Sequence, residues 1–205
     1  MTIRVYTEGE AEEKALGPLL RRELEALRDC RWRIETRCVP GKERLLKQIA
    51  KRVRLAVETD GVDAVFALVD FHPDTRPLEE LKAEMGRHVD KDHRGRFHPH
   101  VAVHDLEAWI LADHGPLQRR LHTALKGWDS PESVDMLKPP KRHINELFLS
   151  HIRHAYKETI DAPKLLGQAD TNLIARKCPH FKAFRDDLLS VAGIDPAQFE
   201  AGAPD

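Results

Sequence analysis

An apolar run at residues 64–69 ends abruptly at Asp70 and is the clearest structural feature of the sequence. A short run of this kind is typical of a strand that is buried on both faces, as in a parallel sheet. Pro73 follows three residues later and cannot continue a central strand. Because ligands bind at the carboxyl ends of strands in open α/β sheets, we expect Asp70 to be a functional carboxylate.

Alternating strand and helix patterns surround this run. Residues 2–7 alternate apolar and polar positions and predict a strand, whereas leucines at helical spacing predict one helix over residues 10–28. The further elements predicted in this half are a strand over 32–39, helices over 42–59 and 78–88, a polar loop over 90–97, a strand over 98–104 and a helix from 105 to 112. The fold class is therefore α/β, with a mainly parallel four-stranded sheet and helices on both faces. Right-handed crossovers would bring the ends of the first, third and fourth strands to one rim.

After residue 113 the pattern predicts helices only. They are expected over residues 116–125, 141–155, 162–167 and 173–191, the last with a break at Cys178-Pro179. The tail from Pro196 is rich in alanine, proline and glycine and is expected to fray. We interpret residues 1–113 as an α/β core and residues 114–205 as a helical C-terminal extension packed on it, in a single domain overall.

Composition narrows the functional classes only modestly. The 205 residues carry a formal net charge of −1, so a basic binding surface would have to be local. Cys30, Cys38 and Cys178 have no zinc-like spacing and favour free thiols in a reducing compartment. No apolar run approaches the roughly 20 residues of a membrane helix, and the N-terminus has no leader-like pattern. We therefore expect a cytoplasmic protein without a membrane partner; its oligomeric state is left open.

Three carboxylates are expected at the rim of the sheet. Glu8 ends the first strand, and Glu12 follows one helical turn later, so both side chains can face one spot. Together with Asp70 they would repel one another unless a cation lay between them. Mg²⁺ and Mn²⁺ prefer such oxygen ligands and can support phosphodiester cleavage. Asp74 is a further candidate metal ligand, although an aspartate that forms a turn is an equal alternative.

A second acidic junction follows the last predicted strand. His104 and Glu107 are candidate catalytic residues there, alongside Glu8 and Asp70. The alternatives are a hydrogen-bonded core histidine for His104 and an acid that favours the helix dipole for Glu107. The coincidence of both residues at a third strand end favours a functional role as much as a structural one.

Basic residues of the second half could hold substrate phosphates near these acids. The candidates are Lys141, Arg142, Lys157 and Lys177. A solvated charged face is the alternative for each of them. Pro40-Gly41-Lys42 lacks the glycine and spacing of a phosphate-binding Walker loop, and no Gly-x-Gly-x-x-Gly motif occurs, so a nucleotide cofactor has no support.

Glu8-Gly9, Glu12 and Asp70 together resemble the metal-binding pattern of Toprim domains, which topoisomerases, primases and overcoming-lysogenization-defect (OLD) nucleases share. Residues 69–71, 104–108, 140–142 and 177–184 resemble, as an ordered set, a bacterial Toprim-like family of unknown function, DUF4276. The resemblance implies phosphodiester cleavage that depends on Mg²⁺, with Mn²⁺ as the alternative ion. It does not fix the substrate, and the choice between DNA and RNA, tRNA included, is left open. The resemblance also implies phage defence beside an ATPase partner, and metal binding by Glu8, Glu12 and Asp70.

The sequence departs from the Toprim pattern at one position. His72 stands where Toprim domains have the second aspartate of Asp-x-Asp. Asp74 or Glu107 could supply the missing carboxylate. The alternative function is a catalytically silent Toprim-like module that binds a protein partner or nucleic acid.

Overall fold

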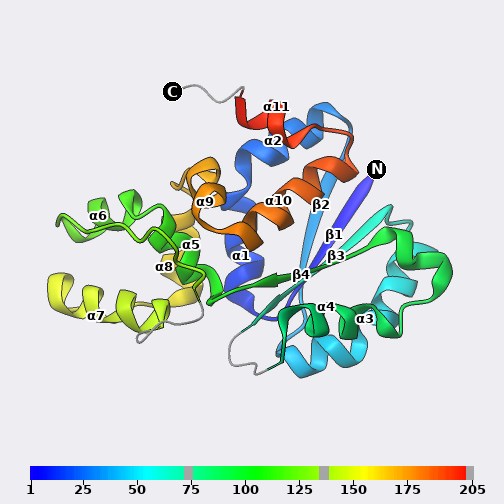
Figure 1. Cartoon of the computed structure of the whole chain (residues 1–205), viewed down its shortest axis with the longest axis horizontal. Coiled ribbons are helices and arrows are strands. Elements are labelled where there is room, and N and C mark those ends of the chain that lie inside the picture. The colour runs from blue at the N-terminus through cyan, green and yellow to red at the C-terminus, as the bar shows by residue number, and fades with distance from the viewer. Residues whose placement is uncertain (72–75, 134–138, 202–205) are drawn as a thin grey trace.

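A four-stranded parallel sheet forms the centre of the protein (Figure 1). The computed structural model describes residues 1–71, 76–133 and 139–201. The strand order is β2-β1-β3-β4, and every neighbouring pair runs parallel, which confirms the sheet predicted from the sequence. Thr7 pairs with Leu68 and with Cys38, so these strands end at the same edge of the sheet. The strands are β1 Thr2–Thr7, β2 Arg33–Cys38, β3 Ala64–Asp70 and β4 Phe97–Ala102.

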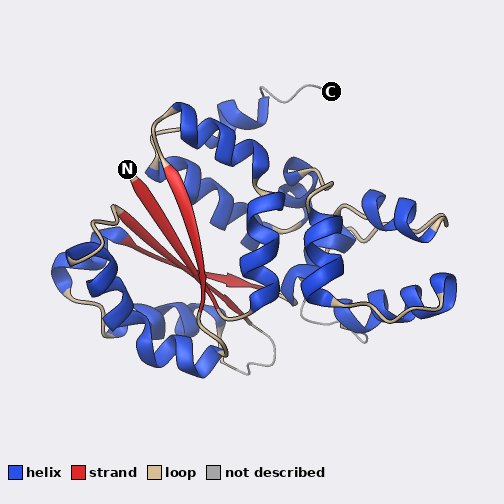
Figure 2. Cartoon of the chain, turned by 180° about the vertical axis from the view of Figure 1, so that it is seen from behind, coloured by secondary structure: helices blue, strands red, loops and turns tan. Residues whose placement is uncertain are grey.

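Helices cover both faces of this sheet (Figure 2). One face packs against α1, α2 and α10, and the other packs against α3 and α4. The α-helices are α1 Glu10–Leu19, α2 Arg21–Asp29, α3 Lys42–Glu58, α4 Leu78–Arg87, α5 Asp105–Ala112, α6 Gly115–Leu121, α7 Pro140–Ile152, α8 Glu158–Leu166, α9 Thr171–Lys177, α10 Pro179–Val191 and α11 Pro196–Ala201. None of the described helices is long and apolar enough to cross a membrane.

Strand β3 is buried on both faces, as its continuous apolar run predicts. Phe66 and Leu68 belong to the apolar cluster under α1 and α10, whereas Val65 and Val69 belong to the cluster under α3 and α4. Burying one such side chain is worth about 1.5–3 kcal/mol relative to exposure. The two clusters thus hold β3 between two layers, and Asp70 emerges where they end.

The C-terminal helices share an apolar cluster with the sheet. Leu16 of α1, Leu166 of α8 and Phe184 of α10 belong to the same buried cluster as Phe66. In the described residues after 113, all regular elements are helical. The division of the chain at residue 113 stays a prediction, because the cluster joins residues from both sides of it.

Four local expectations are corrected. The helix expected over 10–28 is divided at Leu20, where the backbone leaves the helical range (φ −88°, ψ 27°). The loop expected over 90–97 contains the 3₁₀-helix Lys91–Arg96. The strand expected to reach residue 104 ends at Ala102, and the tail expected to fray from Pro196 forms α11 instead.

Candidate functional site

Glu8 joins the ends of three neighbouring strands. Its carboxylate Oε1 accepts a hydrogen bond from the backbone amide of Asp70 at 3.1 Å. Its backbone carbonyl accepts one from the amide of Gly41 at 2.9 Å. Because β1 lies between β2 and β3, the residue after β1 can reach both neighbours. The strand order therefore places Glu8 and Asp70 side by side, as their positions in the sequence predict.

Gly9 allows Glu12 to fold back against the start of α1. A Cβ atom at Gly9 would lie 2.0 Å from Glu12 Oε2, which real atoms do not tolerate. Gly9 has an extended backbone (φ −126°), so the glycine is needed here for space and not for its conformation. The Glu12 side chain is only 3% exposed. Its carboxylate lies in the first turn of a helix, where the helix dipole favours negative charge.

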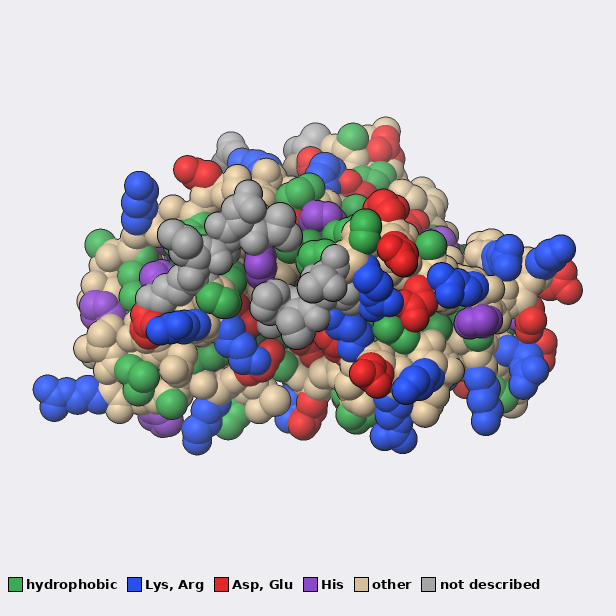
Figure 3. Space-filling model, turned by 60° about the horizontal axis from the view of Figure 1, so that its bottom comes forward, with side chains coloured by type: hydrophobic (Ala, Val, Ile, Leu, Met, Phe, Trp, Pro, Cys, Tyr) green, Lys and Arg blue, Asp and Glu red, His purple; other side chains and the backbone are tan. Residues whose placement is uncertain are grey.

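A hollow of about 370 Å³ opens between these groups. Glu8, Glu12 and Asp70 line it, together with Lys42 and Lys141. The ammonium group of Lys42 donates to the backbone carbonyl of Phe71 at 3.2 Å, and Lys141 is ion-paired with Glu158. Figure 3 turns the lower side of the molecule in Figure 1 forward and shows acidic and basic side chains interspersed on it. The hollow thus combines carboxylates with cations, as a site for a metal and a phosphate would.

The donor set fits a hard divalent cation. Glu8, Glu12 and Asp70 offer carboxylate oxygens, which Mg²⁺ and Mn²⁺ prefer. Within residues 1–71, 76–133 and 139–201, no three His, Cys, Asp or Glu side chains are already arranged to hold a metal ion. The carboxylates would therefore have to turn toward a cation when it binds. Asp74 and His72 lie outside the described residues.

His104 and Glu107 lie at the start of α5 and do not line the hollow. His104 has a left-handed backbone (φ 61°), and its Nε2 donates to the Ser133 carbonyl at 2.6 Å. Glu107 is fully buried. Burial raises the pKa of the Tyr156 phenol above its ordinary value, and the charge of Glu107 beside it raises this pKa further. The catalytic roles of His104 and Glu107 stay predictions.

Of the four candidate substrate-binding cations, Lys141 alone lines the hollow. Arg142 is ion-paired with Glu146 at 3.1 Å. Lys157 is exposed at the start of α8, and the ammonium group of Lys177 donates to the Ala112 carbonyl at 3.0 Å. The structure therefore does not bring these four residues together at the acids, and their roles in substrate binding stay predictions.

Sequence reasoning missed Lys42 and Glu158. The tripeptide 40–42 lacks the spacing of a nucleotide-binding loop, and its informative feature is its position in the fold. Lys42 follows a strand end and begins α3, at the rim shared with Glu8. Glu158 has no such feature in the sequence, since its place depends on how α8 packs against α1.

The structure is similar to the C-terminal region of the Burkholderia pseudomallei OLD protein, with a TM-score of 0.53 and 15% sequence identity. This similarity covers 93% of the present chain and 98% of that one. The C-terminal region of the Xanthomonas campestris pv. campestris OLD protein has a TM-score of 0.45 and 14% identity, over 92% and 96% of the two chains. A comparison with curated proteins finds no match. The Burkholderia similarity confirms the Toprim-like α/β fold.

The family match extends over nearly the whole chain. The family described as a domain of unknown function, DUF4276, matches residues 7–189. The matched region contains the acidic residues of the hollow and the helices that pack around it. The chain belongs to the DUF4276 family, and its fold is Toprim-like.

Proposed function

We propose that this protein is a metal-dependent nuclease that cleaves phosphodiester bonds. One observation carries the proposal: carboxylates from the end of β1, the first turn of α1 and the end of β3 line one hollow, with two lysines at the same hollow. Acids alone would attract cations without favouring a phosphate. The lysines add the positive charge that a phosphate needs.

Each group has a distinct part in the proposed reaction. Glu8, Glu12 and Asp70 would hold Mg²⁺ or Mn²⁺, which supplies Lewis acidity and activates water when bound. The bond from the Asp70 amide fixes the orientation of the Glu8 carboxylate. Lys42, held by the Phe71 carbonyl, places a positive charge at the hollow for the scissile phosphate. Lys141 would exchange its ion pair with Glu158 for contact with substrate.

The proposed substrates are DNA and RNA, with tRNA as one RNA to test. The similarity of fold to the C-terminal region of an OLD protein supports a nuclease in the same structural class. The family resemblance further implies phage defence beside an ATPase partner. Co-purification of the chain with proteins encoded beside it would test that partnership separately from cleavage.

Cleavage of end-labelled DNA, RNA and tRNA tests the proposal. Wild-type protein should cleave at least one substrate with Mg²⁺ or Mn²⁺ and none with EDTA. Asp70→Asn should cleave roughly 100-fold more slowly or worse, since a metal contact to the transition state is worth several kcal/mol. The matched control is Asp129→Asn, an exposed acid remote from β3 in the sequence. Equal cleavage by all three proteins would assign the activity to a contaminant or another site.

The alternative is a catalytically silent module. It is favoured by the lack of a ready three-ligand metal group among the residues that the structure describes. In that case the wild-type protein would bind nucleic acid or a protein partner, and no divalent metal would induce cleavage. Calorimetric titration with Mn²⁺ would then show no site that depends on Asp70.

A further inference from the structure

A second hollow, of about 280 Å³, lies between α6, α7 and α8. Buried side chains of Phe148 and Leu165 contribute apolar surface to it. Arg119, Arg120 and Lys164 supply positive charge to it from α6 and α8. We call it the basic hollow, to distinguish it from the acidic hollow at the strand ends. Its lining combines apolar contact with cations, which suits a phosphate attached to an organic group.

The three cations of the basic hollow are available to a ligand. Among the described residues, Arg119, Arg120 and Lys164 are exposed, and their side chains form no hydrogen bond or ion pair. Asp161 is the acid that lines the hollow, and its Oδ2 already accepts a hydrogen bond from the backbone amide of Lys157 at 2.8 Å. The basic hollow therefore has three cations and one carboxylate, and that carboxylate is already hydrogen-bonded.

The surrounding segment has the same sign of charge. Residues 114–168 contain nine Lys or Arg against six Asp or Glu, although the whole chain has a net charge of −1. A local positive surface on a nearly neutral protein concentrates anions at that surface. The basic hollow is thus placed where a polyanion would be attracted.

The same two helices line both hollows. On α7, Lys141 lines the acidic hollow and Phe148 the basic one; on α8 the corresponding residues are Glu158 and Leu165. Each pair is separated by seven residues, which is about 10 Å along a helix at 1.5 Å per residue. The amide of Tyr156 donates to Asn145 Oδ1 at 3.1 Å and holds the connecting loop along α7. Both helices therefore give the same offset between the hollows.

A nucleic-acid strand carries a phosphate at every nucleotide, so one strand can place phosphates at both hollows at once. We propose that the basic hollow binds a backbone phosphate of the substrate strand, to one side of the phosphate at the acidic hollow. The inference rests on the proposed function, because it takes the acidic hollow as the place of cleavage.

Binding measured in EDTA tests the inference without cleavage. The probes are fluorescein-labelled single-stranded DNA and RNA oligonucleotides, from about two to about twelve nucleotides long, followed by anisotropy. The basic-hollow variant replaces the three cations of that hollow by glutamine: Arg119→Gln, Arg120→Gln and Lys164→Gln. A control variant replaces three other cations, on the exposed side of α3, by glutamine: Arg44→Gln, Lys51→Gln and Arg54→Gln.

The basic-hollow variant should bind the longer oligonucleotides roughly ten-fold more weakly than wild type. The slope of log affinity against log salt concentration should become less steep by about 2, which is about 0.7 for each of the lost phosphate contacts. The loss should be absent for the shortest probes, which cannot span both hollows. The control variant should stay within about two-fold of wild type. Equal affinity of the two variants for every probe would overturn the inference.

Two further outcomes separate the inference from the proposed function. If Asp70→Asn keeps full cleavage while the basic-hollow variant still binds weakly, the proposed cleavage site fails, and the basic hollow stands as a phosphate site. If Asp70→Asn abolishes cleavage while the basic-hollow variant binds like wild type, the inference alone fails. Nucleoside monophosphates should compete only at high concentration. Competition as strong as that of the long oligonucleotides would indicate a free-nucleotide site and overturn the strand assignment.

Discussion

The carboxylate of Glu8 accepts a hydrogen bond from the backbone amide of Asp70 at 3.1 Å, across 62 residues of sequence. The bond joins the residue after β1 to the last residue of β3, at the carboxyl ends of the two central strands. Glu8 therefore has a structural role as well as the proposed role in metal binding. A substitution at Glu8 alters both unless it keeps the acceptor oxygen.

Glu8→Gln and Glu8→Ala separate these two roles. Glutamine keeps an oxygen that can accept the Asp70 amide, so we expect its free energy of unfolding to stay within about 0.5 kcal/mol of wild type. Its loss of charge should lower metal-dependent cleavage by roughly 100-fold. Alanine should lose the activity and, in addition, about 1 kcal/mol of stability. Urea denaturation and cleavage assays on both variants test this. Unchanged cleavage by Glu8→Gln would exclude Glu8 as a metal ligand.

Gly9→Ala should weaken metal binding while the fold persists. The new methyl group would occupy the position of Glu12 Oε2, and the flexible Glu12 side chain can turn away from it at little cost in stability. A displaced carboxylate should lower the affinity for Mn²⁺ by roughly ten-fold, by analogy with losses of supporting groups at other metal sites. Calorimetric titration measures this affinity directly.

The matched control is Gly86→Ala in α4, where an added Cβ meets nothing within 4 Å. Alanine in a helix is favoured over glycine, so this variant should be more stable by about 0.5–1 kcal/mol and bind Mn²⁺ like wild type. If Gly9→Ala also bound Mn²⁺ like wild type, Glu12 would not be a ligand.

The alternation of patterns was sufficient to predict the sheet and the place of its chemistry. The apolar run before Asp70 indicates burial on both faces, and Glu8 ends a strand that must lie in the same sheet. Both inferences depend on local sequence and on the handedness of crossovers. They are therefore accessible without knowledge of how the helices pack.

The remainder of the site depends on contacts between distant segments. Lys141 and Glu158 reach the acidic hollow because α7 and α8 begin beside it, and no periodicity within either helix encodes that placement. The same limit explains the error at the C-terminus. Composition predicted a frayed tail from Pro196, whereas α11 forms because Glu200 finds Arg185, which is buried in another helix.

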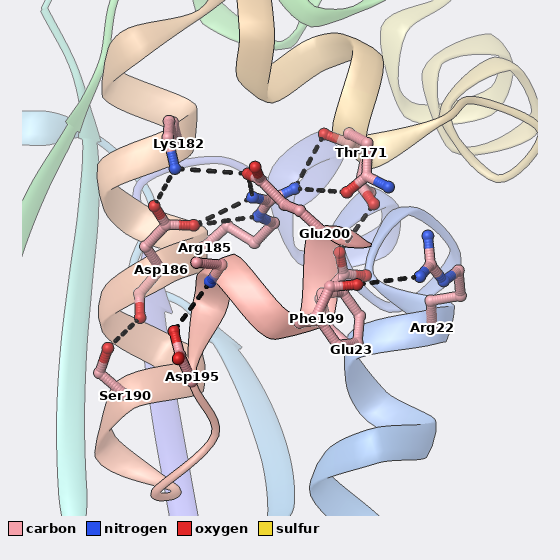
Figure 4. A network of polar contacts seen from close by, with 12 residues as sticks. Arg22, Glu23, Thr171, Lys182, Arg185, Asp186, Ser190, Asp195, Phe199 and Glu200 are labelled. Carbon is pink, nitrogen blue, oxygen red and sulfur yellow. Dashed lines mark hydrogen bonds and ion pairs between the residues drawn. The ribbon is translucent and has the colours of Figure 1, made fainter. Parts of the chain in front are cut away.

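Arg185 is the centre of a buried polar network that holds α11 (Figure 4). Its side chain is fully buried and donates to Asn172 Oδ1 at 3.0 Å and to Asp186 Oδ1 at 3.0 Å. It also pairs with Glu200. Burial by itself raises the pKa of Glu200, but Arg185 outweighs this effect and holds the pKa below its ordinary value. Glu200 therefore supplies negative charge that a buried guanidinium needs.

Glu200→Gln should destabilise the protein by about 1–2 kcal/mol, less than for a fully buried pair because Glu200 is partly exposed. Lys182→Met should lower the free energy of unfolding by less than Glu200→Gln does. Lys182 contacts the same carboxylate as Arg185 but is more exposed than Arg185. Gln198→Ala, on the exposed side of α11, is the control. Urea denaturation measures all three. A cost at Glu200 no larger than that at Gln198 would show that α11 does not depend on this pair.

Asp187 of α10 joins that helix to two histidines of β4. His98 Nδ1 and His100 Nε2 donate to the same carboxylate oxygen, at 3.0 and 2.9 Å. Both imidazoles stack on Phe66, and His100 also contacts Phe184 edge to face. Burial by itself raises the pKa of Asp187, but the hydrogen bonds from His100 and His98 outweigh it and hold the pKa well below its ordinary value.

Asp187→Asn should therefore cost stability only where the wild-type carboxylate is ionised. A folded-state pKa below the unfolded value of 3.8 contributes stability above about pH 4, and this contribution is lost as the pH falls through the folded-state pKa. At pH 7 we expect a cost of about 1–2 kcal/mol, after allowance for the partial exposure of Asp187. Urea denaturation between about pH 7 and about pH 3 should show this difference shrink at the acid end. Asp129→Asn should change nothing across the range, and a cost at Asp187 that did not vary with pH would assign it to packing instead of charge.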